Sequence, residues 1–98
     1  MKSSLENLWI AHMNREFPDC RGEEIQGIDL VLLDSTAAGC ISSLISASKS
    51  NYDKEKIDIL KKCIWELETI LRKLHGYSKE YFESLKEVSV LIIQGLEK

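Results

Sequence analysis

Residues 53–76, DKEKIDILKKCIWELETILRKLHG, carry the clearest periodicity in the chain. Apolar side chains recur there at spacings of three and four residues, which is typical of one face of an α-helix. Asp53 is a good N-cap because its carboxylate can accept a hydrogen bond from a free amide of the first turn, and Gly76 is a typical C-terminal stop. The pattern predicts a helix over residues 54–75. Its apolar seam consists of Ile57, Leu60, Ile64, Leu67, Leu71 and Leu74.

The N-terminal segment predicts a shorter helix. Ser3 and Glu6 have the spacing of a capping box, and apolar residues follow them at helical intervals. Pro18 restricts the backbone of the residue before it, so it ends the helix and starts a connecting loop. We expect this helix to cover about residues 4–16.

Two more helices complete the expected fold. Residues 28–47 are apolar on most sides, which is typical of a helix that other helices surround. A strand could begin with Ile28–Leu33, but the helical period continues well beyond it and favours a helix. Ser78 is placed to cap a last helix over residues 78–96. Short connections make consecutive helices antiparallel neighbours, so we predict an all-α, up-down four-helix bundle that forms a single domain over residues 1–98.

Composition narrows the range of partners. The chain has 98 residues, of which 44% are hydrophobic and 30% charged, and its formal net charge is -3. Basic and acidic residues are interspersed, so the sequence offers no positive patch for the phosphates of a nucleic acid. The longest apolar runs are far shorter than the roughly 20 residues of a membrane span, and the N-terminus lacks the apolar stretch of a signal peptide. We expect a cytoplasmic protein with neither nucleic acid nor membrane as a partner.

The chain gives little indication of enzyme chemistry. It contains none of the common phosphate-binding, zinc-binding or nucleophile motifs, so we predict no cofactor and no metal, and we lean against an enzyme. Three cysteines, Cys20, Cys40 and Cys63, are an odd number at wide spacings. This arrangement suits reduced thiols that pack as small hydrophobic groups.

Asp34 breaks the apolar face of the predicted helix over residues 28–47. A buried carboxylate needs a hydrogen bond or an ion pair, or its pKa rises, and such groups are over-represented at functional sites. We expect Asp34 to bond a Trp, Tyr, His or Arg of another helix and to fix the packing register. His12 lies on the inward side of the first helix, where a hydrogen-bonded, half-buried imidazole is expected. An alternative is a small acid–base or metal cluster of Asp34 and His12 with Asp29 or another acidic loop residue.

A second set of residues suggests an interface. Trp65 stands on the charged face of its helix, close to Lys61 and Arg72, and exposed aromatic residues are enriched at protein–protein interfaces. Near the end of the last helix, Val90–Ile93 are all apolar, so the helix has no polar face there. Leu91 is the residue of this run that we expect to contact a partner. A small chain with surplus apolar surface commonly pairs with itself.

One segment carries a resemblance to known sequences. Residues 22–34, GEEIQGIDLVLLD, and residues 38–42, AGCIS, resemble short, uncharacterised bacterial proteins. The likeness extends to Leu8–Trp9 and Phe17–Pro18. It implies a bacterial, cytoplasmic origin and no particular activity.

The sequence supports three functional hypotheses. The first is a non-enzymatic helical module for protein–protein interaction that forms a homodimer or binds another protein. The second is a small ligand-binding protein or enzyme that uses Asp34 and His12. The third is an acidic inhibitor or immunity-type protein, because an acidic surface suits a basic partner.

Overall fold

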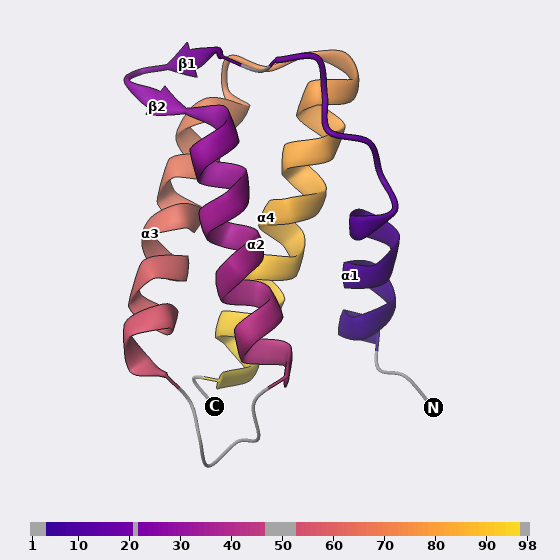
Figure 1. Ribbon diagram of the computed structural model, residues 1–98, viewed down its shortest axis with the longest axis vertical. Helices are drawn as coiled ribbons and strands as arrows, with labels where there is room; N and C mark the ends of the chain where they lie inside the picture. Colours follow the sequence, from indigo (N-terminus) through magenta and orange to yellow (C-terminus); the bar gives the residue numbers. More distant parts are fainter. Residues whose placement is uncertain (1–3, 21, 47–52, 97–98) are drawn as a thin grey trace.

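Four helices form most of the described chain, as the ribbon in Figure 1 shows. The computed structural model describes residues 4–20, 22–46 and 53–96. The helices run alternately up and down, and the all-α four-helix bundle that the sequence predicts is confirmed. Their bounds are α1 Ser4–Met13, α2 Leu30–Ser46, α3 Lys54–Leu71 and α4 Gly76–Leu96.

The core lies between α2, α3 and α4, which contact one another in all three pairs, whereas α1 packs mainly against α4. In the apolar seam of α3, Leu60 and Leu67 are fully buried. Phe82 and Leu85 of α4 are also fully buried. Trp9 of α1 joins this core and fastens the short helix to the bundle. Burial of these apolar surfaces is the main force that holds the helices together.

Aspartates cap two of the helices. The Asp53 carboxylate accepts a hydrogen bond from the Glu55 amide at 3.0 Å, which confirms the predicted N-cap of α3. Asp29 does the same for α2, where its carboxylate accepts from the Leu32 amide at 3.0 Å. Each cap satisfies an amide that has no partner inside the helix. The capping box predicted for α1 involves Ser3, which is outside the described residues.

Several predicted helix ends are wrong by a few residues. α1 ends at Met13 rather than at residue 16. α3 ends at Leu71 rather than at residue 75, because the chain closes a tighter turn there, in which the Lys73 amide donates to the Ile70 carbonyl. Gly76, predicted to stop α3, is instead the first residue of α4, with a φ of 58°. Helix α4 therefore begins before Ser78, its predicted cap.

A β-hairpin that the sequence reading missed precedes α2. Strand β1, Glu24–Ile25, pairs antiparallel with β2, Ile28–Asp29. The turn residues have φ values of 55° at Gln26 and 79° at Gly27, as two-residue hairpin turns require. Because β2 uses the first two residues of the predicted second helix, α2 starts at Leu30. The strands are too short to show an alternating pattern in the sequence.

Candidate functional site

Asp34 lies half-buried on α2 and is bonded to the neighbouring helix α4. The Tyr81 hydroxyl donates to Asp34 Oδ1 at 2.7 Å. Tyrosine is one of the partners that the sequence analysis expects for this carboxylate. Burial raises the pKa of Asp34, and the bond from Tyr81 opposes that rise. Burial and the carboxylate together raise the pKa of Tyr81, so its hydroxyl stays protonated and remains a donor at neutral pH.

His12 of α1 packs against the ring of Tyr81. Its side chain is 3% exposed, and Nδ1 lies 2.9 Å from Ser84 Oγ of α4. The His12 ring centre is 4.6 Å from that of Tyr81 and 5.8 Å from that of Trp9. Burial, with a smaller contribution from the Arg15 charge, lowers the pKa of His12 to about 4. The imidazole is therefore neutral at neutral pH, and more buried than the sequence analysis expects.

The structure joins Asp34 and His12 through Tyr81. We call this group, which also includes Ser84, the Tyr81 cluster. It connects α1 and α2 to the same helix, α4. Tyr81 and Ser84 are the members that the sequence reading missed. Tyr81 combines an apolar ring with a polar tip on the inward face of a predicted helix, and this was the available signal.

Asp29, the third candidate polar residue, does not join the Tyr81 cluster. It is exposed, and its carboxylate caps α2. Within the described ranges, no group of three or more His, Cys, Asp or Glu side chains could hold a metal ion. Cys20, Cys40 and Cys63 are buried, free thiols, as predicted. Burial raises the pKa of each of them, to about 11 for Cys63, so they are poor nucleophiles.

A small recess opens beside the Tyr81 cluster, between α2 and the loop that follows α1. Its volume is about 290 Å³, and it is lined by Phe17, Val31, Asp34 and Ser35. His12 is not one of its lining residues. The recess therefore combines one carboxylate with apolar walls and a hydroxyl group.

The candidate interface on α3 is exposed to solvent. Trp65 is 66% exposed, and Lys61 and Arg72 beside it are also exposed. An aromatic ring that stands this far out has surface available for a partner.

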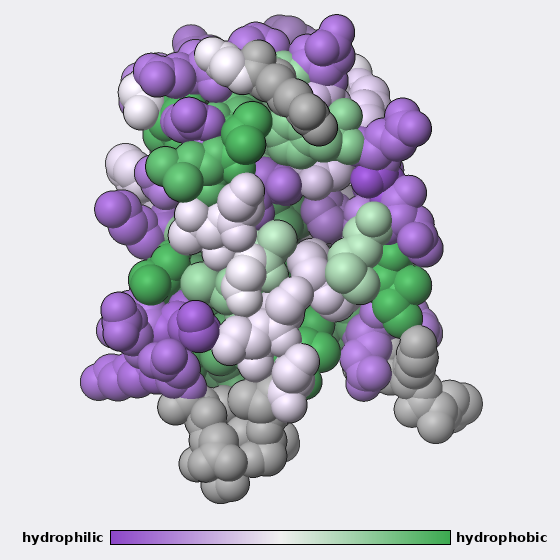
Figure 2. All heavy atoms as spheres, viewed as in Figure 1, coloured by the Kyte–Doolittle hydropathy of each residue, from purple (hydrophilic) through white to green (hydrophobic). Residues whose placement is uncertain are grey.

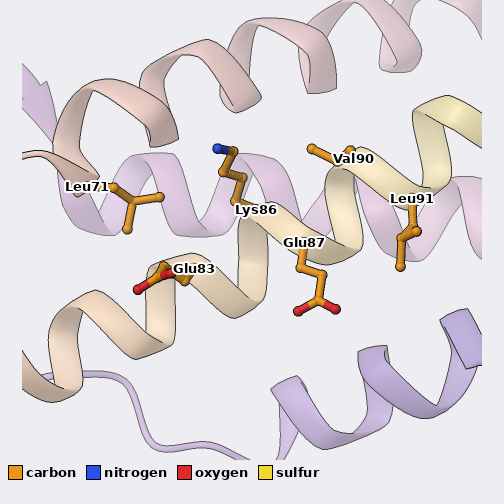
Figure 3. Close-up of a pocket in the computed structure, with 6 residues that line it drawn as sticks. All are labelled: Leu71, Glu83, Lys86, Glu87, Val90 and Leu91. Atoms are coloured by element: carbon orange, nitrogen blue, oxygen red, sulfur yellow. The ribbon is translucent and has the colours of Figure 1, made fainter.

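The end of α4 carries less free apolar surface than the sequence suggests. Ile92 and Ile93 are buried in the core, so the expected surplus over Val90–Ile93 is wrong for both. Leu91 is 36% exposed. It lines a cavity of about 350 Å³ on the outer side of α4, to which α3 contributes Leu71 (Figure 3). Charged side chains of α4 border the same cavity.

The outer face of α2 was missed as a candidate surface. Val31 is 40% exposed and Leu32 is 65% exposed. Asp34 is the single charged residue among the 17 of this helix, although 30% of the chain is charged. Figure 2 shows white and green atoms over this helix, between purple regions on both sides. We define the outer face of α2 by its exposed residues Val31, Leu32, Ser35, Gly39, Ser42 and Ser46.

Comparisons with known proteins give no relative for this chain. No family model, curated protein sequence or solved structure matches it. The resemblance to short bacterial proteins therefore stays a prediction. The described residues also contain no helix that is both long and apolar enough to cross a membrane.

Proposed function

We propose that this protein is a non-enzymatic helical interaction module that self-associates through the outer face of α2. The observation that carries the proposal is the exposure of Val31 and Leu32 on a face without charge that no other helix of the described chain covers. Exposed apolar surface with a polar border is typical of protein–protein interaction sites.

The charge pattern favours a second copy of the chain over a different partner. Around a two-fold axis, a helix face meets its own equivalent, so a face whose charges are mostly of one sign would approach like charges. The outer face of α2 avoids this repulsion because its residues are uncharged. The rest of the surface is acidic in sum, with a net charge of -3 for the chain, and two such surfaces repel each other. Contact between copies is therefore most favourable along α2.

The size of this face predicts a weak dimer. A helix of 17 residues is about 26 Å long and about 10 Å wide. One crossing of two such helices buries much less than the roughly 1,600 Å² of a standard stable interface. We therefore expect a dimer whose population rises with protein concentration, and a cytoplasmic, bacterial setting in which its thiols stay reduced.

Sedimentation equilibrium over a range of concentrations from micromolar to millimolar tests the proposal. We expect the wild-type mass to rise toward that of a dimer. The variant Leu32→Glu places a carboxylate on the outer face of α2 and is expected to remain a monomer. Because Leu32 is 65% exposed, this change should leave the helical circular dichroism spectrum unaltered.

The matched control is Trp65→Ala, which removes an equally exposed side chain from α3. It is expected to dimerise like the wild type. A wild-type monomer at millimolar concentration contradicts self-association. Dimers that persist in Leu32→Glu but dissociate in Trp65→Ala contradict the choice of face and assign the contact to α3.

A further inference from the structure

The recess beside Asp34 has the chemistry of a cation site. Tyr81 donates one hydrogen bond to Asp34 Oδ1, whereas a carboxylate offers about four acceptor positions. Asp34 is also one of the residues that line the recess, an open space of about 290 Å³. That space is large enough for a small organic group.

The walls of the recess add selectivity. Phe17 is half-buried, with its ring held edge-on against Tyr81 at 5.4 Å and Phe82 at 6.1 Å between ring centres. An aromatic ring fixed in this way can attract a cation or pack against an alkyl stem. Val31 supplies further apolar surface, and the Ser35 hydroxyl supplies a polar atom at the same recess.

We propose that the Asp34 recess binds an organic cation, a primary ammonium or guanidinium group, whose N–H groups donate to the carboxylate while its carbon stem packs against Phe17 and Val31. The carboxylate is half-buried, so the charge attraction is screened less than at an exposed aspartate. The hydrogen bond from Tyr81 orients the carboxylate before the cation arrives. The proposal does not require self-association, but Val31 and Ser35 also belong to the outer face of α2. Cation binding is therefore measured at protein concentrations low enough for the chain to be a monomer.

The pKa of Asp34 gives a readout that a purely structural carboxylate lacks. Burial raises that pKa, and a bound cation stabilises the ionised form. Cation binding must therefore lower it. The pKa of Asp34 is measured from the carboxyl ¹³C shift of labelled protein over a pH series.

The experiment uses n-butylammonium and methylguanidinium as probes and the uncharged n-butanol as a control of similar size. We expect saturable shifts of the Phe17, Val31 and Ser35 amide signals with both cations, and a fall in the pKa of Asp34. The variant Asp34→Asn keeps an oxygen that can accept from Tyr81 but loses the charge, and it should weaken binding at least tenfold. The matched variant Asp58→Asn, at an exposed carboxylate of α3, should bind like the wild type.

A further titration distinguishes two sources of the cation, a side chain of a partner protein and a free small amine. Blocked tripeptides with a central lysine or arginine carry the same cationic groups as protein side chains. Tighter binding of these peptides than of the free probes indicates a side chain of a partner, and tighter binding of the free probes indicates a small amine.

Three results would overturn the proposal. Equal shifts in the wild type and Asp34→Asn show that the charge is not used. Equal binding of n-butanol shows an apolar pocket only. The absence of saturable shifts with both cations in the wild type shows that the recess does not bind an organic cation.

Discussion

His12 couples the packing of α1 to pH. Its imidazole is enclosed by Trp9, Tyr81 and Ser84, and burial lowers its pKa from 6.5 to about 4. The unfolded chain therefore takes up a proton at a higher pH than the folded chain does. This difference destabilises the fold as the medium becomes acidic.

We predict that the free energy of unfolding falls as pH decreases from about 6.5 to about 4. The slope from His12 is at most about 1.4 kcal/mol for each pH unit, or up to about 3 kcal/mol in total. Asp34 acts in the opposite sense, because a raised pKa in the folded state favours folding at the lower pH. Urea unfolding of the wild type and His12→Gln at matched pH values isolates the His12 contribution.

The fall in the free energy of unfolding with decreasing pH should be smaller in His12→Gln than in the wild type, because the variant lacks the buried imidazole. A parallel pH dependence in the wild type and His12→Gln would mean that the imidazole titrates alike in the folded and unfolded chains. The matched control is His75→Gln, which makes the same substitution at an exposed histidine.

The sequence predicted the polar residues of the Tyr81 cluster better than their partners. Asp34 stands out because a carboxylate interrupts an apolar stripe, and His12 because it falls on an inward helix face. Tyr81 belongs to another helix, 47 positions later in the chain, and only the packed bundle brings it to Asp34. Ser84 carries no pattern of its own, since single serines are common on helices.

At the scale of one element, Asp29 caps the N-terminus of α2. Its carboxylate accepts from the Leu32 amide, and the hairpin leads directly into the helix. We predict that Asp29→Ala lowers the free energy of unfolding by about 1 kcal/mol, because it leaves a first-turn amide without its partner. Thermal and urea unfolding measure this loss.

Asp58→Ala is the matched control, since Asp58 is an exposed aspartate of α3 that lies beyond the capping position Asp53. Its effect is expected to stay within about 0.5 kcal/mol. An Asp29→Ala variant as stable as this control would show that Asp29 is only a surface residue and that the start of α2 depends on the hairpin.

The spacing of apolar residues in the sequence predicts that a helix is present. Where the helix ends depends on local hydrogen bonds, and these leave no trace in that spacing. The seam from Ile57 to Leu71 identifies α3 without ambiguity. The end of the same helix depends on a turn from Lys73 to Ile70. The hairpin before α2 depends on a left-handed backbone at Gln26 as well as Gly27, and glutamine gives no signal for it.

At the scale of the whole molecule, the distribution of charge is more informative than its sum. A net charge of -3 is ordinary, but α2 contributes a single charged residue, Asp34. Its inward residues form the core, and its outer residues are left exposed and neutral. The proposed contact with a second copy would account for an exposed helix face without charge.

Isotope-filtered NOE spectroscopy on a mixture of ¹³C-labelled and unlabelled protein tests that contact most directly, because it reports only pairs of protons in different copies. We expect intermolecular NOEs from the methyl groups of Val31 and Leu32 to α2 of the other copy at millimolar concentration. Intermolecular NOEs confined to Trp65 or Leu91, with none from α2, would contradict self-association through the outer face of α2.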